Sequence, residues 1–345
     1  ADLGYLVGPG PPGAVMAVVA VGPVCRAGEQ IVAEVEGRPG RITEARFRDR
    51  KERPPLPCAL SALQIEAGRL FRMGAKDVLD AAQSLYERHQ LITYPRSDCR
   101  YLPEGHFEQR QSVVQAIARV DEDLGQACDG ADTARRSSAW NDAKVDAHHA
   151  IIPTSRAAAK GKLSQAERNI YNLISRYYLM QFYPPAVFAD AKLVFDIAGG
   201  VFIAKGRQLI NPGWKALMGK TDTEEKGDGT DAVPPLDKGS VLTCREGVIG
   251  DKKTEPPKHF TEATLLQAMT GIARFVANKD LKAILKETDG LGTEATRAGI
   301  LDTLFKRQLL TRQGKSIHSS PAGRGLIHAL PEDSTFPDMT AHWEH

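Results

Sequence analysis

Cysteine is scarce in this sequence, and its spacing argues against two common uses of the residue. Only five cysteines occur in 345 residues, and no two of them form a C-x-x-C pair. A zinc ribbon needs such pairs and a disulfide framework needs an even number. We therefore expect reduced thiols. The five are Cys25, Cys58, Cys99, Cys128 and Cys244.

Long apolar runs are absent as well. No stretch reaches the ~20 apolar residues that cross a bilayer, so no membrane partner is expected. Residues 3–24 carry no charge, but proline and glycine interrupt them too often for a membrane span or a signal peptide. They show neither a helical nor a strand period. We expect residues 1–24 to be an unassigned, disordered leader that is non-native or comes from an altered reading frame.

Charge of one sign is not in large excess. The formal net charge is only +2, while 42% hydrophobic and 26% charged residues are typical of a soluble globular protein of two or three domains. Local charge says more. Residues 38–53 hold seven Lys or Arg against three acidic residues, and residues 297–324 hold six against Asp302 alone. Such clusters are usually solvated surface, but beside a phosphate-handling site they are candidate contacts to a nucleic-acid backbone.

Helical periodicity dominates the middle of the chain. Apolar residues recur with helical spacing over residues 61–71 and over residues 75–88, where Tyr86 falls on the apolar face. Ser164 and Glu167 have the spacing of a capping box that opens a further helix. We expect these apolar stripes to build a core, and we assign them no chemistry.

Residues 186–250 change to a strand period. Leu193, Phe195 and Ile197 alternate with their neighbours, and the Gly-Gly pair at 199–200 supplies a hairpin turn. The sequence therefore predicts a β segment between two helical regions.

Three shorter signals complete the pattern. A strand is expected within the basic segment, near residues 41–48. Residues 219–231 are hydrophilic and are expected to form a mobile loop. Thr261 is the expected N-cap of a helix over residues 262–269.

One segment combines a tyrosine with a permanent cation. Within residues 91–102, Tyr94 is followed by Pro95 and Arg96. Proline pushes the preceding residue toward an extended conformation, which presents the phenol at the end of an element. A phenol has an ordinary pKa near ~10, so it needs positive charge nearby to act as a nucleophile at neutral pH. An arginine offers that charge and a planar fork of donors that suits phosphate.

These residues indicate attack on a phosphodiester, although Tyr-Pro-Arg alone is more often a turn with a packed ring. The wider context favours the chemistry. Residues 91–102 resemble the active-site segment of type IA DNA topoisomerases, in the form closest to the bacterial topoisomerase III branch. Residues 148–154, 257–265 and 290–298 resemble further segments of that family in the same order. The resemblance covers roughly residues 50–345.

The resemblance implies a fold class and a domain order. The class is α+β and multidomain, with a helical gate domain inserted in a β-rich arch and a helical domain that binds single-stranded DNA. After the leader, residues 25–57 are expected to form a partial β or linker segment. The gate domain then covers residues 58–185, the arch segment residues 186–256, and the partial DNA-binding domain residues 257–345.

The resemblance also implies an activity. It is transient cleavage of single-stranded DNA through a 5′-phosphotyrosine, then strand passage and religation without ATP, which relaxes or decatenates DNA. The implied catalytic residues are Tyr94, Arg96 and His148. Residues 290–297 resemble a phosphate-cradling turn before a helix, without the lysine of a Walker motif. The residues expected to contact DNA are Arg100, Lys279, Lys282, Thr293, Thr296, Arg297 and Arg307.

The resemblance further implies Mg²⁺, held by an acidic N-terminal domain whose motifs this sequence lacks. The only Asp-x-Asp pattern, residues 121–123, ends an amphipathic helical stretch, and we interpret it as a solvated helix terminus. We therefore expect no metal ligands here. We also expect the isolated chain to relax DNA weakly or not at all.

Two alternatives stay open. The chain can be an inactive single-stranded DNA-binding fragment or regulatory module, which covalent capture of an oligonucleotide would distinguish from an enzyme. It can also be another tyrosine strand-transfer enzyme, but a recombinase places its tyrosine near the C-terminus and a relaxase carries three clustered histidines. The expected partner is single-stranded DNA and the expected location is the cytoplasm, with the nucleoid. The sequence does not set an oligomeric state.

Overall fold

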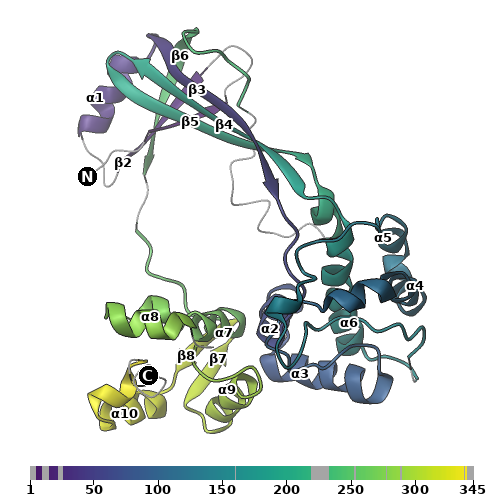
Figure 1. The fold of residues 1–345 in the computed structure, drawn as a ribbon. Helices are drawn as coiled ribbons and strands as arrows, with labels where there is room; N and C mark the ends of the chain where they lie inside the picture. The colour runs from purple at the N-terminus through teal and green to yellow at the C-terminus, as the bar shows by residue number, and fades with distance from the viewer. Residues whose placement is uncertain are drawn as a thin grey trace. The chain divides into compact units, whose positions relative to one another are not determined.

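The computed structural model describes residues 5–9, 15–21, 26–159, 161–218, 233–251, 254–276, 278–287, 290–337 and 339. The chain separates into two compact units (Figure 1). The first consists of Ala1–Pro54 and Pro184–Pro257, and the second of Pro55–Tyr183 and Lys258–His345. The chain therefore crosses between units three times, each time beside a proline, which interrupts regular structure. The predicted mobile loop over residues 219–231 lies outside the described residues.

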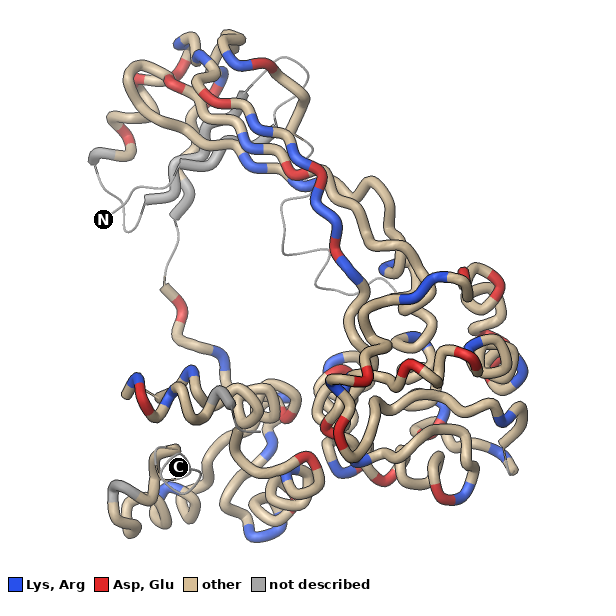
Figure 2. The backbone as a smooth tube through the Cα atoms, viewed as in Figure 1, with Lys and Arg blue, Asp and Glu red and all other residues tan. Residues whose placement is uncertain are grey.

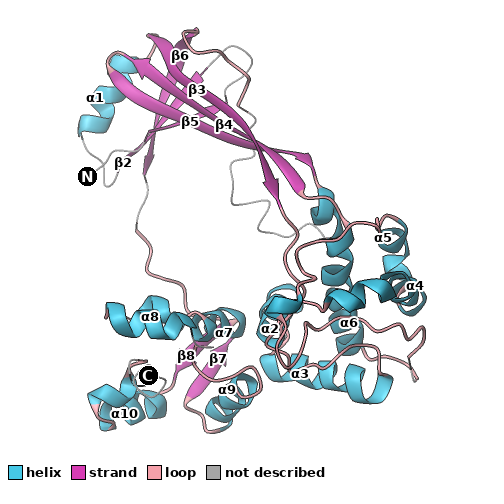
Figure 3. Ribbon diagram, in the orientation of Figure 1, coloured by secondary structure: helices cyan, strands magenta, loops and turns pink. Residues whose placement is uncertain are grey.

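The first unit is built on one closed sheet (Figure 3). The strand order is β1-β2-β6-β3-β4-β5, in which the long strands β3 and β5 both pair antiparallel with β4, which lies between them. One helix, α1, packs beside β6. The elements are β1 (Tyr5–Pro9), β2 (Val15–Val21), α1 (Arg26–Val35), β3 (Pro39–Glu52), β4 (Ala186–Ile197), β5 (Gly200–Asn211) and β6 (Val241–Asp251).

The β4–β5 hairpin confirms the strand period that the sequence predicts. The turn uses Ala198 and Gly199, whose φ angles are +50° and +82°. Asp196 Oδ1 accepts a hydrogen bond from the Gly199 amide at 3.0 Å. Two consecutive positive φ angles suit the right-handed twist of an antiparallel pair. The buried face of β4 consists of Leu193, Phe195 and Ile197.

The uncharged N-terminal stretch differs from its prediction. The structure forms strands β1 and β2 there, paired antiparallel from Tyr5 opposite Val19 to Pro9 opposite Val15. Valine and alanine dominate β2, and β-branched residues favour strands when a neighbouring strand supplies the pairing. Here β6 supplies it, in a parallel ladder along β2. Local periodicity could not reveal a partner more than 220 residues away, so the expectation of disorder does not hold for these two segments.

The second unit is mainly helical (Figure 3). No helix in the described part of the chain is both long and apolar enough to cross a bilayer. The α-helices of the second unit are α2 (Leu60–Phe71), α3 (Ala75–Ser84), α4 (Arg110–Val120), α5 (Gly125–Asp129), α6 (Gln165–Leu179), α7 (Glu262–Thr270), α8 (Lys279–Glu287), α9 (Arg297–Lys306) and α10 (Pro321–Ala329). Its β-hairpin consists of β7 (Leu310–Gln313) and β8 (Ser316–Ser319).

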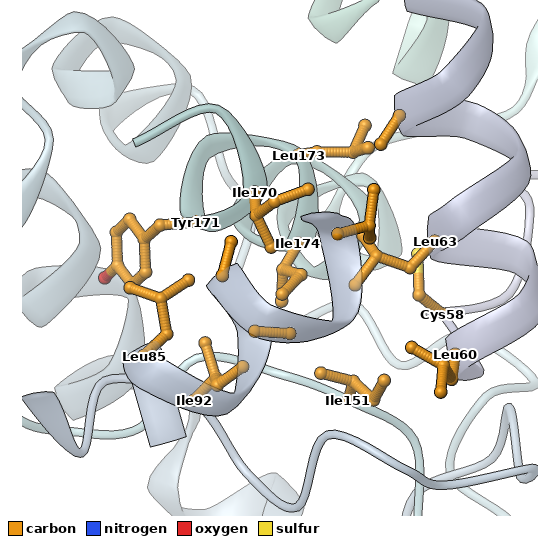
Figure 4. Close-up of a cluster of buried hydrophobic side chains, with 14 of the residues drawn as sticks. Cys58, Leu60, Leu63, Leu85, Ile92, Ile151, Ile170, Tyr171, Leu173 and Ile174 are labelled. Carbon is orange, nitrogen blue, oxygen red and sulfur yellow. The ribbon is translucent and has the colours of Figure 1, made fainter. Parts of the chain in front are cut away.

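The main core of this unit lies between α2, α3 and α6 (Figure 4). The predicted apolar stripes supply it, which confirms helices over residues 61–71, from residue 75 onward and after Ser164. Burial of each large apolar side chain stabilises the fold by about 1.5–3 kcal/mol. The labelled members of the core in Figure 4 include Leu60, Leu63, Leu85, Ile92, Ile151, Ile170 and Ile174.

Helix α6 begins with the predicted capping box. The Ser164 hydroxyl accepts a hydrogen bond from the Glu167 amide at 3.2 Å, and Glu167 Oε2 accepts one from the Ser164 amide at 2.6 Å. Ser84 donates a further hydrogen bond to Glu167 Oε1 at 2.6 Å. Burial alone would raise the pKa of Glu167, but these hydrogen bonds outweigh it and lower the pKa to about 2.

A depressed pKa predicts a defined acid sensitivity. Because the folded pKa of Glu167 lies below its ordinary value of 4.5, its contribution to the stability of the fold is fully present above pH 4.5 and is lost as the pH falls toward about 2. We expect the Glu167→Gln variant to be less stable at pH 7 by of the order of 2 kcal/mol. The difference from the wild type should shrink between pH 4.5 and 2, as measured by urea unfolding. A difference that stays constant over this range would contradict the assignment.

Candidate active site

An extended segment places Tyr94 beside the histidine segment. The Thr93 amide donates to the carbonyl of Ile152 at 2.9 Å, and the Thr154 amide donates to the carbonyl of Leu91 at 2.9 Å. The Thr93 hydroxyl accepts a hydrogen bond from the Ile152 amide at 3.0 Å. Residues 91–93 therefore form a short ladder with residues 150–154. Pro95 ends it in a turn, which fits the extended conformation that the sequence predicts before a proline.

The Tyr94 ring is held between two other rings. His148 stacks on it with ring centroids 4.5 Å apart and planes 23° apart. Tyr86 contacts it edge-on, with centroids 5.9 Å apart and planes 83° apart. Such aromatic contacts contribute about 0.5–1.5 kcal/mol each and fix the plane of the ring. Tyr94 remains 37% exposed, so a substrate can reach it.

Tyr86 is not the core residue that the helical pattern predicts. It is 39% exposed and faces Tyr94. The physical reason is a π-helical turn, Leu85–His89, which follows α3 directly. A π turn holds more residues than an α turn, so the helical register changes within it: Leu85 and His89 stay buried, while Tyr86 is exposed. Such turns often occur at functional sites.

Arg96 is held by a neutral partner. Its Nη2 donates a hydrogen bond to Gln83 Oε1 at 3.2 Å, and Gln83 Nε2 donates to Glu87 Oε1 at 2.8 Å. Among the described residues, no carboxylate lies within ion-pair distance of Arg96. The side chain is exposed. Gln83 therefore orients the guanidinium of Arg96 but leaves its positive charge in place. A charge of this kind is available to bind an anion such as phosphate.

The two neighbouring histidines have different surroundings from His148. Burial lowers the pKa of His149, although a hydrogen bond from its Nδ1 to the carbonyl of Ala150, at 2.8 Å, opposes this. Burial and the nearby His149 also lower the pKa of His106, whose ring lies 4.5 Å from that of His149. Both are therefore neutral at pH 7, and only His148 of the three contacts the Tyr94 ring.

The predicted phosphate-cradling turn is a rigid loop before α9. Gly290 and Gly292 have φ angles of +84° and +69°, and a Cβ at Gly290 would collide with the carbonyl of Met269. The Thr296 hydroxyl accepts a hydrogen bond from the Thr293 amide at 2.9 Å. Both threonines are exposed. The loop therefore presents two hydroxyl groups on a backbone that has little freedom.

The buried position of Arg297 argues against its expected contact with DNA. It is 1% exposed, and its Nε and Nη2 donate to the carbonyls of Leu291 at 3.0 Å and Gly292 at 2.7 Å. Its Nη1 pairs with Glu294 Oε1 at 2.7 Å. A guanidinium has five donors in a fixed fork and is suited to holding several oxygens at once. Arg297 therefore organises the loop from inside and does not present its charge to solvent.

The remaining residues that were expected to contact DNA lie in different elements of the second unit. Arg100 donates from Nε and Nη2 to the carbonyls of Pro57 at 2.9 Å and Leu56 at 2.8 Å, so it braces the entry into α2. Arg307 is exposed at the end of α9. Lys279 is exposed and Lys282 is half-buried, both on α8. The structure thus brings Tyr94 and His148 into direct contact and gathers the two threonines in one loop, while Arg96 follows Tyr94 by two residues and contacts Gln83.

Lys and Arg recur along the long strands of the first unit (Figure 2), and the strand register places six of them on one face of the sheet, called here the basic face. It faces away from the buried side of β4, because successive residues of a strand point to opposite faces. Two carboxylates on this face are paired: Glu44 with two of its cations, and Asp190 with one. The basic face consists of Arg46, Arg48, Arg50, Lys192, Lys205 and Arg207.

Metal ligands are not grouped among the residues that the structure describes. Within those ranges, no three His, Cys, Asp or Glu side chains are placed to hold a metal ion. The described residues therefore do not form the Mg²⁺ site that the family resemblance implies.

A comparison with known protein families identifies the family of this chain. A family model described as DNA topoisomerase matches residues 26–345. This chain belongs to the DNA topoisomerase family. The prediction made from the four ordered motifs is confirmed.

Individual relatives of this topoisomerase chain agree. It is 61% identical over 317 residues to DNA topoisomerase 3 of Vibrio cholerae, which covers 92% of this chain and 49% of that protein. It is 54% identical over 316 residues to DNA topoisomerase 3 of Haemophilus influenzae, covering 92% of this chain and 48% of that protein. The chain spans about half the length of these relatives. They place it in the topoisomerase III-like branch of the type IA topoisomerases.

A solved structure shows the same fold. Full-length topoisomerase I from Thermotoga maritima matches 93% of this topoisomerase chain and 50% of its own, with a TM-score of 0.62 and 19% sequence identity. At that identity the likeness concerns the fold alone. It confirms the predicted α+β class, with one β-rich unit and one helical unit in this chain.

Proposed function

We propose that this chain cleaves and rejoins single-stranded DNA through Tyr94. The phenolic oxygen would attack a backbone phosphorus, a new Oη–P bond would form, and the bond from phosphorus to the 3′ oxygen would break. The 5′ phosphate would stay on the tyrosine, and the 3′ oxygen would leave as a hydroxyl after taking up a proton. The observation that carries the proposal is the exposed Tyr94 ring, held between His148 and Tyr86, two residues before an arginine that no described carboxylate neutralises.

Arg96 and His148 would act on the phosphate. Arg96 places a permanent charge two residues from the nucleophile, where it can stabilise the negative charge that develops on the phosphoryl oxygens. His148 lies against the Tyr94 ring and can donate a hydrogen bond or a proton to the same group. The covalent link conserves the energy of the broken bond. Religation by the 3′ hydroxyl therefore needs no ATP, and passage of another strand before it would relax or decatenate DNA.

The strand would be bound mainly through its phosphates. Thr293 and Thr296 present hydroxyl groups on the rigid loop, and the exposed end of α9 and helix α8 add positive charge. Arg100 and Arg297 are left out of this interface because their donors hold backbone carbonyls. Phosphate contacts predict strong salt dependence and little sequence preference. The cations of the proposed interface are Lys279, Lys282 and Arg307.

The basic face of the first unit offers a second set of phosphate contacts. Arg48, Arg50 and Lys205 form no ion pair with any described residue. We expect replacement of all three by glutamine to reduce the slope of log affinity against log salt by up to about 2, since each single-strand phosphate contact contributes about 0.7. Fluorescence anisotropy with a labelled oligonucleotide over a salt series measures this. The control replaces Lys51, Lys238 and Arg245, which lie outside the basic face, and an equal change there would contradict the assignment.

We further propose, from the family resemblance of the motifs, that the natural enzyme requires Mg²⁺ and no ATP and acts in the bacterial cytoplasm on nucleoid DNA. The decisive experiment is covalent capture. A 5′-labelled and a 3′-labelled single-stranded oligonucleotide are incubated with the protein in Mg²⁺-containing buffer and the reaction is stopped with detergent. A protein–DNA band that carries only the 3′ label supports the proposal. Tight binding without any band would instead indicate a single-stranded DNA-binding module.

A further inference from the structure

Helices α2 and α3 each begin without a capping side chain of their own. The N-cap of α2 is Ala59 and that of α3 is Gly74, and neither provides a side-chain hydrogen bond. The first amide groups of a helix have no partner within it and attract acceptors, most strongly anionic ones. Both helix starts are therefore sites that another part of the chain must satisfy.

Two glutamates from the C-terminal part of the same unit satisfy them. The Ser61 amide, in the first turn of α2, donates to Glu294 Oε2. The Ala75 amide, in the first turn of α3, donates to Glu262 Oε1 at 2.6 Å. Each glutamate has an arginine on its other oxygen, Arg297 for Glu294 and Arg312 for Glu262. The two caps are thus built alike, although the residues that they join are 233 and 187 positions apart.

The start of α2 is also the anchor of the nucleophile segment. The Leu60 amide, next to that of Ser61, donates to the carbonyl of Ser97 at 2.9 Å. Ser97 is fully buried and lies three residues after Tyr94. Its hydroxyl accepts a hydrogen bond from the Cys99 amide at 3.1 Å, which closes the turn. One helical turn therefore holds both the Tyr94 segment and the Glu294 carboxylate.

Glu294 belongs to the loop that presents Thr293 and Thr296. The buried Arg297 fixes its carboxylate and the carbonyls of Leu291 and Gly292 together. Polar contacts thus connect the loop to the nucleophile segment: Arg297 holds Glu294, Glu294 binds the Ser61 amide, and the neighbouring Leu60 amide binds the carbonyl of Ser97. The backbone then leads from Ser97 to Tyr94, three residues earlier. The groups in these contacts are buried or half-buried, where such bonds are stronger than in water.

We propose that Glu294 is a positioning residue for the cleavage step, which couples the strand-binding loop to the Tyr94 segment through the first turn of α2. The inference rests on the proposed function for its chemical readout. When a strand occupies the loop, Glu294 keeps α2, and with it Ser97 and Tyr94, in register with the bound phosphates. The equivalent contact of Glu262 at α3 does not do this, because it binds the end of α3 that is farther from Gln83 and the Tyr94 site.

The test compares Glu294→Gln with Glu262→Gln in the full-length natural protein. In each variant the glutamine side chain keeps an oxygen for its arginine, but the start of the helix loses its negatively charged partner. We expect Glu294→Gln to slow single-turnover formation of the covalent adduct by at least about 10-fold, since small misplacements of reacting groups are costly. Glu262→Gln should stay within about 2-fold of the wild type. The oligonucleotide concentration for half-maximal rate should change less than about 2-fold in both.

A second readout does not depend on chemistry. Hydrogen–deuterium exchange in peptides that cover residues 94–99 should slow when an oligonucleotide binds to the wild type and to Glu262→Gln, and should stay fast in Glu294→Gln. Equal losses of adduct rate in the two variants, or protection of residues 94–99 in all three proteins, would overturn the inference. A wild type that forms no adduct would refute the proposed function instead, and the exchange result would still decide the coupling. If Glu294→Gln does not fold, Glu294→Asp takes its place, because it keeps the charge for Arg297 but is one methylene short of Ser61.

Discussion

Replacement of Tyr94 by phenylalanine should abolish covalent capture of single-stranded DNA. The variant lacks only the phenolic oxygen, so the ring contacts with His148 and Tyr86 can remain. Without that oxygen no Oη–P bond can form, and the expected adduct is zero. Because the hydroxyl makes no described hydrogen bond that stabilises the fold, the unfolding free energy should change by less than about 0.5 kcal/mol. Binding of the oligonucleotide should be unchanged.

The matched control is Tyr86→Phe. Tyr86 is exposed to a similar extent, touches the same ring and lies in the same site. Its hydroxyl has no part in the proposed bond formation, so the control should retain adduct formation within a few-fold. Denaturing gels with a labelled oligonucleotide measure both variants. An adduct that persists in Tyr94→Phe, or one that is lost equally in Tyr86→Phe, would be incompatible with Tyr94 as the nucleophile.

Replacement of Arg96 by alanine should produce the second-largest effect. Removing a donor that stabilises charge in the transition state costs about 10²–10³ in rate. The loss should fall on the rate of adduct formation at saturating oligonucleotide, with a smaller effect on affinity. Fold stability should hardly change, because Arg96 is exposed and its one described contact is a 3.2 Å hydrogen bond to Gln83.

Arg156→Ala is the matched control for this variant. Arg156 is also exposed, and its Nη2 donates to the amide oxygen of a glutamine, Gln90, at 2.7 Å. It carries the same charge and makes the same kind of contact away from Tyr94. Single-turnover rates should therefore separate the two variants by at least about 10-fold. Comparable rates for both would show that Arg96 contributes only general positive charge.

Much of the local structure followed from patterns that act over a few residues. The capping box at Ser164 and Glu167, the N-cap at Thr261 and the turn at Gly199 are each determined by neighbours in sequence. Their formation needs no knowledge of the tertiary fold. The extended conformation expected at Tyr94 is of the same kind, because a proline ring acts directly on the residue before it.

The rest depends on partners that are distant in sequence. Tyr86 left the predicted core because a π turn shifted the helical register, and no propensity rule places such a turn. Arg297 was expected to contact DNA, but its guanidinium is buried and binds three oxygens of its own loop. Strand β2 was missed because its partner, β6, is far along the chain. Each case is decided by tertiary contacts rather than by local pattern.

The candidate site, too, could be predicted from the sequence only in part. The motif supplied Tyr94, Arg96 and His148, and the ladder between residues 91–93 and 150–154 explains how two of these come into contact. The sequence could not indicate that Gln83 orients Arg96. It also could not indicate that Glu294 caps a helix whose first residue precedes it by more than 230 positions.

The most direct measurement maps the covalent link itself. The adduct between the full-length protein and a single-stranded oligonucleotide is digested with nuclease and protease, and the modified peptide is sequenced by tandem mass spectrometry. We predict a nucleotide joined through its 5′ phosphate to Tyr94, within the peptide that also contains Pro95. A nucleotide found on any other side chain, or joined to Tyr94 through a 3′ phosphate, would contradict the account.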